Sequence, residues 1–241
     1  MQVTTEDDVL LRGWWIDHPN PKSVVVLAHG YLMNRAEPIP LAKRLYEEGL
    51  ACLVFDFRAH GVSGGRLSSV GPHEKNDVLA MVQHARAEYP DKSIWIWGSS
   101  MGGAATVLAT EAMEVRPDAL VLDSPYSSLI RANEGWWRTF AGKFWPFLVP
   151  VWMFCWLMTR VDPRKVRIDH ELSKMPDIPV LLMIGDCDVI VPLNEARKIA
   201  DASENCRMEL FEGCQHSQAR WFHPVEYDER LFRFLKEQNL I

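Results

Sequence analysis

KSIWIWGSSMGGAATVLATEAM, residues 92–113, reads in order as a short apolar strand, an abrupt turn flanked by glycines and a helix of small residues. The turn from Gly98 to Gly102 fits the pattern G-x-S-x-G, with Ser100 at its centre. Glycine is needed at both ends because a strand that turns directly into a helix crowds its own backbone. We therefore expect Ser100 Oγ to project from a sheet at the N-terminus of a helix, where free N–H groups can stabilise a negative charge.

The composition is that of a soluble globular protein, with 48% hydrophobic and 24% charged residues in a chain of 241. A chain of this length is most simply one domain, residues 1–241, with a well-developed core. The formal net charge of −6 argues against nucleic acid as a partner.

The five cysteines include no C-x-x-C pair, which argues against a zinc site and favours a reducing compartment, so we expect a cytoplasmic protein. Whether Cys206 and Cys214 are paired is left open. The N-terminal segment MQVTTEDDVL is acidic and polar, unlike a secretory signal or a membrane anchor. Because a strand is predicted almost directly after Met1, a further segment upstream is left open, as is association with a membrane.

Strand and helix patterns alternate along the chain, which predicts an α/β fold with a mostly parallel sheet and helices on both faces. The unbroken apolar run within KSVVVLAHG, residues 22–30, is typical of a strand that is buried on both faces. Further strands are predicted at 50–57, 93–97, 118–123, 180–185 and 207–211, with a hairpin within the first 17 residues. Helices are predicted at 39–48, 73–89, 101–113, 193–202 and 224–238.

One segment interrupts this alternation and predicts a small helical cap, residues 125–178, inserted within the domain. The segment is too long for a simple crossover between two strands. Residues 144–158 within it, FWPFLVPVWMFCWLM, carry no charge. A membrane span needs about 20 apolar residues, and Pro146 and Pro150 interrupt this run, so we interpret it as part of a cap over the end of the sheet.

Two residues after Ser100 could complete a nucleophilic site, because a serine nucleophile needs a base and a carboxylate that orients the base. Asp188 lies just past the predicted strand 180–185, at the edge where open α/β sheets place their sites. His216 lies in the loop after the next predicted strand. The order serine, aspartate, histidine is the one that accompanies this turn motif.

In these features the chain resembles a serine hydrolase of the α/β-hydrolase fold, of the carboxylesterase and monoacylglycerol-lipase type. The resemblance covers almost the whole chain except the cap. It depends on five motifs in the family's order, which are His29-Gly30, the DFRAHGVSGG loop from Asp56, GSSMG, Gly185-x-x-Asp188-x-x-Val191-Pro192 and the GCQHS loop around His216.

The resemblance implies that Ser100 is the nucleophile, His216 the general base and Asp188 the acid that orients the histidine. It also implies an oxyanion hole made by the backbone N–H groups of Tyr31 and Met101. Two such donors would lower the barrier by about 3 kcal/mol each. No metal ion or organic cofactor is expected.

Other residues compete for these roles. Ser99 also lies in the turn, but a side chain at its position should point away from the site. Asp123 ends an earlier strand, from which a carboxylate could also reach a histidine, and Asp186 lies two residues before the preferred aspartate. We expect His29 to position the oxyanion loop and His60 to make structural hydrogen bonds.

The predicted reaction is hydrolysis of a carboxylic ester with a hydrophobic acyl group, such as that of a monoacylglycerol-like lipid. The substrate prediction depends on the cap, whose aromatic side chains suit a fatty or aromatic acyl group. The residues expected to line the acyl pocket are Trp137, Phe144, Trp145, Trp152 and Trp156. Two alternatives stay open, since these side chains could instead bury the cap against the sheet or lie in a lipid surface.

Two other functions also stay open. An acyl thioesterase would use the same three side chains and would differ only in its substrate. A non-catalytic hydrolase-fold protein that binds lipid or acts as a scaffold belongs to another class, and the intact serine, aspartate and histidine argue against it.

Overall fold

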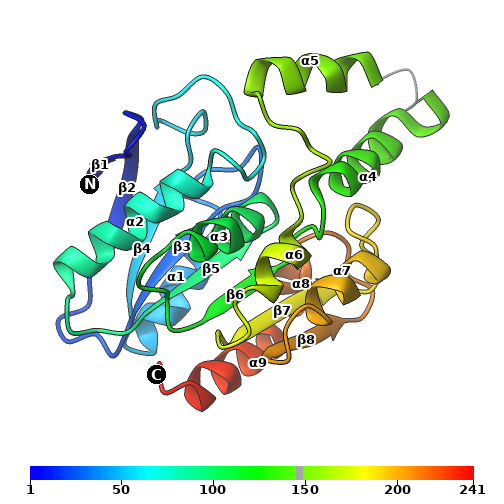
Figure 1. Cartoon of the computed structure of the whole chain (residues 1–241). Helices are drawn as coiled ribbons and strands as arrows, with labels where there is room; N and C mark the ends of the chain where they lie inside the picture. Colours follow the sequence, from blue (N-terminus) through cyan, green and yellow to red (C-terminus); the bar gives the residue numbers. More distant parts are fainter. Residues whose placement is uncertain (145–148) are drawn as a thin grey trace.

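The computed structural model describes residues 1–144 and 149–241, and the side chains in these ranges apart from those of Val149 and Trp152. Within these residues eight strands form one sheet in the order β1-β2-β4-β3-β5-β6-β7-β8 (Figure 1). β1 pairs with β2 and β2 with β4 in antiparallel fashion, whereas the pairings from β4 to β8 are parallel. The strands are β1 (Gln2–Thr4), β2 (Leu10–Ile16), β3 (Val24–Ala28), β4 (Ala51–Asp56), β5 (Ile94–Ser99), β6 (Leu120–Asp123), β7 (Val180–Gly185) and β8 (Cys206–Phe211). The predicted mostly parallel sheet is confirmed.

The central strands are apolar throughout because a layer of helices covers each face of the sheet. In β3, Val24 and Val26 belong to one core cluster, whereas Val25 and Leu27 belong to the other. All four side chains are fully buried. Successive side chains of a strand point to opposite faces, so an unbroken apolar run is what two buried faces require.

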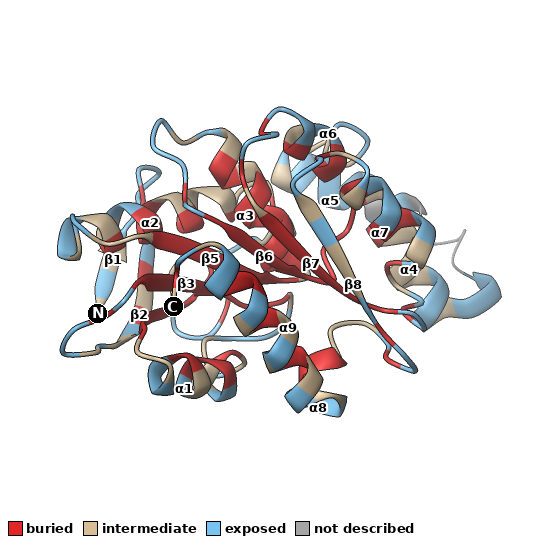
Figure 2. Cartoon of the chain, turned by 90° about the horizontal axis from the view of Figure 1, so that it is seen from below, coloured by how far each residue is buried: buried red, intermediate tan, exposed pale blue. Residues whose placement is uncertain are grey.

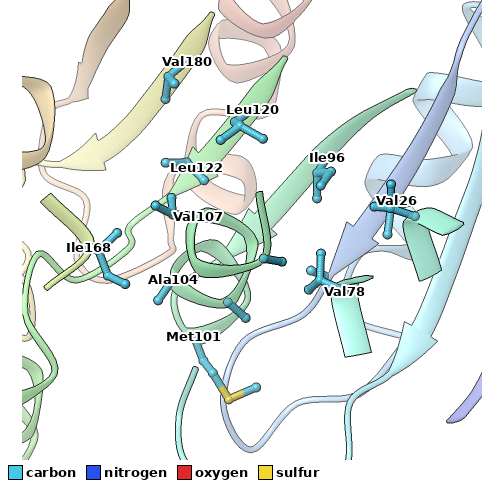
Figure 3. Close-up of a cluster of buried hydrophobic side chains, with 14 of the residues drawn as sticks. Val26, Val78, Ile96, Met101, Ala104, Val107, Leu120, Leu122, Ile168 and Val180 are labelled. Atoms are coloured by element: carbon cyan, nitrogen blue, oxygen red, sulfur yellow. The ribbon is translucent and has the colours of Figure 1, made fainter. Parts of the chain in front are cut away.

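The helices form two layers, which Figure 2 shows on either side of the buried strands. The first layer contains α2 (Lys75–Glu88), α3 (Met101–Glu111), α6 (Ile168–Ser173) and α7 (Leu193–Ala200). The second contains α1 (Ile39–Glu47), α8 (Ala219–Phe222) and α9 (Pro224–Glu237). Figure 3 shows part of the first core, where Ile168 of α6 lies beside Ala104 and Val107 of α3.

α4 (Leu129–Ala141) and α5 (Val149–Thr159) form an arm that stands away from both layers (Figure 1). The start of α4 is buried through Leu129 and Ala132. One turn further, Gly135 packs so closely on the Asp188 loop that a Cβ would lie 2.4 Å from the carbonyl oxygen of Ile190. No helix in the described part of the chain is both long and apolar enough to span a bilayer.

The short helix α8 was not expected from the sequence, and α6 lies near the end of the segment that was predicted as a helical cap. α6 follows the arm, and its Ile168 and Leu172 are buried in the same core cluster as α3. It therefore packs on the sheet although it falls within the predicted cap. The cap boundaries, residues 125–178, stay a prediction.

Candidate active site

Ser100 lies at the turn from β5 into α3, in a backbone conformation that few residues with a side chain adopt. Its φ is +49° and its ψ is −112°, and its N–H donates to the carbonyl of Asp123 over 2.8 Å. A Cβ on Gly98 would lie 2.6 Å from the backbone of Gly102, and a Cβ on Gly102 would lie 2.2 Å from the carbonyl oxygen of Ala28. Both positions therefore require glycine, because the backbone is crowded there as the sequence indicated.

The structure brings Ser100, His216 and Asp188 into one chain of hydrogen-bonding contacts. His216 Nε2 lies 2.8 Å from Ser100 Oγ, and His216 Nδ1 lies 2.7 Å from Asp188 Oδ2. Asp188 Oδ1 accepts hydrogen bonds from the backbone N–H groups of Ile190 and Val191 at 2.9 and 2.8 Å. The carboxylate is thus held at both oxygens, and it orients the imidazole with Nε2 toward the serine.

The two competing carboxylates are engaged with other partners. Asp186 Oδ1 accepts a hydrogen bond of 2.8 Å from the backbone N–H of Gly213, which fixes the start of the loop that carries His216. Asp123 is fully buried, and its Oδ2 pairs with Arg220 at 2.8 Å. Both side chains therefore support loops around the site.

The N–H groups of Tyr31 and Met101 lie in elements that adjoin Ser100. Met101 is the first residue of α3, so its N–H has no carbonyl partner in a preceding helical turn. Gly30, which precedes Tyr31, lies against the turn, because a Cβ on Gly30 would be 3.8 Å from Ser100 Cβ. The N–H of Gly30 itself donates to Glu37 Oε2 at 2.7 Å, which holds the end of β3 in place.

His29 fixes the same strand end in a neutral form. Its Nε2 accepts a hydrogen bond of 3.0 Å from the N–H of Phe57, so the ring proton is on Nδ1, which donates to the Gly30 carbonyl at 2.7 Å. Burial lowers the pKa of His29 to about 4. His60 also supports this loop, since its Nε2 accepts from the N–H of Leu32 at 3.3 Å. Both histidines make the structural contacts that the sequence suggested.

The buried His29 predicts a loss of stability in mild acid. The pKa of His29 is about 4 in the folded protein, against 6.5 for a histidine in water, so the unfolded chain binds the proton more tightly between these values. As the pH falls from about 6.5 to about 4, this residue should lower the free energy of unfolding by about 3 kcal/mol. Urea unfolding at about pH 7 and about pH 4.5 measures the loss.

A matched pair of variants assigns this pH dependence. In His29→Gln the side-chain oxygen can still accept from Phe57 but cannot titrate, so the acid loss should shrink. The exposed His170→Gln should retain the wild-type pH dependence. An identical pH dependence in all three proteins would exclude His29 as the cause.

A buried polar network that the sequence did not reveal links the elements around Ser100. Arg220 of α8 is buried; its Nη1 donates to Asp123 Oδ2, and its Nη2 pairs with Glu37 Oε1. Glu37 holds Gly30 through its other oxygen. Ser99 Oγ lies 3.4 Å from Arg220 Nη1, so the residue before Ser100 also belongs to the network.

The network also reaches the loop that carries His216. Ser99 Oγ donates to Ser217 Oγ at 3.3 Å, and the N–H of Ser217 donates to Ser124 Oγ at 3.1 Å. Burial opposes the charge of Arg220, but its two carboxylate partners raise its pKa above the ordinary value. No motif marks these residues, because they come from distant parts of the chain and meet only in the folded protein.

The predicted acyl-pocket residues occupy the arm in different ways. Trp137 of α4 is half-buried, whereas Phe144 and Trp156 are exposed. Trp145 lies outside the described residues, and the side chain of Trp152 is likewise not described. Their part in a pocket stays a prediction.

Trp136 connects the arm to the site. Its ring centroid lies 6.3 Å from that of Tyr31 in an edge-on contact, and 4.8 Å from that of Phe140 in a stacked one. Three aromatic rings in contact, those of Tyr31, Trp136 and Phe140, thus extend from the end of β3 toward the exposed end of α4.

The described residues include no group of three or more His, Cys, Asp or Glu side chains arranged to hold a metal ion. All five cysteines are free thiols, including Cys206 and Cys214.

The sheet order, its two helix layers and the serine turn between β5 and α3 are those of the α/β-hydrolase fold, and they define an esterase- and lipase-like serine hydrolase. The particular family follows from the sequence match. The chain belongs to the Hydrolase_4 family, described as serine aminopeptidase, S33, whose model matches residues 19–176.

Similar proteins support this assignment. The esterase Pf2001 of Pyrococcus furiosus superposes with a TM-score of 0.82 at 29% identity, over 98% of this chain and 90% of that one. The uncharacterized protein Rv2307c of Mycobacterium tuberculosis is 27% identical over 99% of this chain and 79% of its own length. The lysophosphatidylserine lipase ABHD12 of Rattus norvegicus is 28% identical over 76% of this chain, which spans only 45% of that lipase.

Proposed function

We propose that this protein hydrolyses carboxylic esters with a hydrophobic acyl group, through an acyl-enzyme formed on Ser100. The observation that carries the proposal is the chain of contacts from Ser100 through His216 to Asp188, at 2.8 and 2.7 Å. The serine is held at the N-terminus of α3 in a strained turn, where its hydroxyl projects from the sheet.

In the proposed mechanism, Ser100 Oγ attacks the ester carbonyl carbon while His216 Nε2 takes the hydroxyl proton. The tetrahedral intermediate places its negative oxygen toward the N–H groups of Tyr31 and Met101. Collapse of the intermediate breaks the bond to the alcohol, which leaves with the proton from His216. The oxygen of a water molecule then attacks the acyl carbon while its proton passes to the same nitrogen. The second tetrahedral intermediate breaks the bond to Ser100 Oγ, which takes the proton back from His216 as the acid leaves, and Asp188 stabilises the imidazolium in both steps.

The hydrophobic acyl group is proposed from the aromatic surface beside the site. Trp136 contacts Tyr31 and stacks on Phe140, which suits an alkyl chain better than a charged substrate. The similarity to an esterase and to a lysophosphatidylserine lipase agrees with a lipid that carries a single acyl chain, such as a monoacylglycerol. We further propose a cytoplasmic location, as the cysteine pattern suggests.

A panel of p-nitrophenyl esters from acetate to palmitate tests the substrate class. We expect kcat/KM to rise with acyl length by about tenfold or more between acetate and octanoate, because each buried methylene adds binding free energy. Monooleoylglycerol and lysophosphatidylserine serve as natural-type substrates, and Ser100→Ala serves as the blank. A preference for the acetyl ester would overturn the proposed hydrophobic acyl group.

Three further measurements distinguish the alternative functions. Competition by octanoyl coenzyme A that exceeds competition by the matched ester would indicate a thioesterase. Turnover of alanyl p-nitroanilide in place of the esters would indicate a peptidase, in keeping with the description of the family. Failure of a fluorophosphonate probe to label Ser100 would indicate a non-catalytic protein.

A further inference from the structure

α5 is apolar on every side and yet exposed. Met153, Phe154 and Leu157 are 64%, 61% and 75% exposed. A helix that buries only one face normally carries polar residues at its exposed positions. Phe140 of α4 is 68% exposed as well. Monomeric proteins seldom leave many large apolar side chains of one segment in water, so we infer that the arm has an apolar partner.

The charges around the arm have the opposite sign to those of the rest of the chain. From the first residue of α4 to the residue before α6, residues 129–167, there are seven Lys and Arg residues and two Asp and Glu residues, a net charge of +5. Because the whole chain carries −6, the remainder carries −11. The cations are Arg131, Arg138, Lys143, Arg160, Arg164, Lys165 and Arg167, and they lie before, beside and after the apolar helix.

Two of these cations lie directly on aromatic rings of the arm. Lys143 Nζ is 5.4 Å from the ring centroid of Phe144, and the guanidinium of Arg164 is 5.1 Å from that of Trp156. Aromatic rings beside long cationic side chains are typical of helices that lie at a membrane interface, with the rings in the acyl boundary and the charges at the headgroups.

A cavity of about 230 Å³ lies at the base of the arm and is lined in part by Arg131, Arg164, Arg167 and Lys198. Glu195 also lines it and pairs with Lys198 at 2.7 Å, so the three arginines are the cations of the cavity that Glu195 leaves to a lipid. Arg164 and Arg167 each hold a neighbouring carboxylate through Nε and Nη2. Those two pairs do not use Nη1, the guanidinium nitrogen that a lipid phosphate could approach.

We propose that the α4–α5 arm docks on the surface of a bilayer that contains anionic lipid. The apolar side chains of α5 enter the acyl boundary, while the surrounding cations bind the headgroups and the acidic remainder of the protein faces water. The docking itself does not require catalysis. It deepens the proposed function, because it places the path from Phe140 through Trp136 to Tyr31 at the membrane that would supply an acyl lipid.

A second copy of the chain is the competing occupant, and the charges disfavour it. In a two-fold dimer through the arm, the same segment meets itself, so two segments with a net charge of +5 each would be brought together. An anionic bilayer satisfies both the apolar surface and the cations.

Flotation with vesicles tests the proposal, with phosphatidylcholine alone compared with phosphatidylcholine that contains phosphatidylserine. We expect binding to the anionic vesicles at least about tenfold tighter, with a loss of that preference at high salt. The double variants Phe154→Ser/Leu157→Ser and Lys143→Glu/Arg160→Glu should each weaken binding by about tenfold or more. Val115→Ser and Lys43→Glu, which alter an exposed apolar and a cationic residue away from the arm, are the matched controls.

Each contrary outcome overturns the proposal. Equal binding to both vesicle types would show that the cations do not contribute to docking. No binding to either type would show that a bilayer is not the partner of the arm. A dimer in analytical ultracentrifugation that Phe154→Ser/Leu157→Ser abolishes, without vesicle binding, would make the arm a self-association surface. Melting curves of the variants that match the wild-type curve would establish that the variants fold. Vesicle binding by Ser100→Ala separates this inference from the proposed hydrolysis, because docking should persist when turnover is lost.

Discussion

Ser100→Ala is expected to lose ester hydrolysis by on the order of 10⁶-fold in kcat, because the variant retains the site but has no atom to form the acyl-enzyme. The fold should persist, since alanine keeps the Cβ and adds nothing to the crowded turn. Hydrolysis of p-nitrophenyl butyrate and labelling by a fluorophosphonate probe measure the loss, and the melting temperature checks the fold.

Ser99→Ala is the matched control, because it removes the neighbouring hydroxyl, which contacts Ser217 and Arg220 and makes no contact with His216 among those described. It should still be labelled by the probe. If Ser99→Ala lost labelling and Ser100→Ala retained it, the nucleophile would be Ser99. A third variant, Ser100→Gly, should be more stable than Ser100→Ala by about 1–2 kcal/mol, because glycine relieves the strain of a φ of +49°.

Arg220→Met is expected to lower the free energy of unfolding by about 3–5 kcal/mol, because it leaves Asp123 and Glu37 buried without their cation. For a chain of this length the loss corresponds to a fall in melting temperature of about 10 °C. Activity should fall as well, by about 10- to 100-fold in kcat/KM, because the network holds Gly30 and Ser99 on two sides of Ser100, the proposed nucleophile.

Two comparisons make this prediction specific. Arg233→Met removes an exposed ion pair with Glu209 and should change stability by no more than about 1 kcal/mol. Adding Asp123→Asn and Glu37→Gln to Arg220→Met removes the unpaired charges, so the triple variant should recover part of the lost stability. A stability of Arg220→Met within about 1 kcal/mol of wild type would contradict the network's role.

The sheet was predictable because its strands carry local signals. The valines of β3 and the alternating Ile and Trp residues of β5 are buried on both faces, which leaves unbroken apolar runs bounded by turn residues. The turn around Ser100 was equally readable, since its glycines are required by contacts to Gly102 and Ala28 that almost any such turn would make.

The rest depended on tertiary contacts that leave no local pattern. α8 has only four residues, too few for a periodic signal, yet it places Arg220 among carboxylates more than 90 positions away. The packing of α6 on the sheet likewise left no local signal. The sequence alone left open whether Asp188 or Asp123, each at the end of a strand, contacts the histidine. The 2.7 Å contact between Asp188 and His216 favours Asp188.

The contact between Gly135 and Ile190 limits which part of the arm could be exchanged for another segment. The N–H of Ile190 holds the carboxylate of Asp188, so the first turns of α4 pack on the loop that positions this proposed catalytic side chain. Gly142, with a φ of +52°, lies on the far side of that contact, and no atom of the described residues lies within 4 Å of the place that a Cβ would take there. We therefore expect that a segment grafted between Gly142 and the end of α5 would alter which molecule is recruited and would leave the contact between α4 and the Asp188 loop in place. The exchangeable part of the arm begins after Gly142, whereas the turns of α4 before it are joined to that loop.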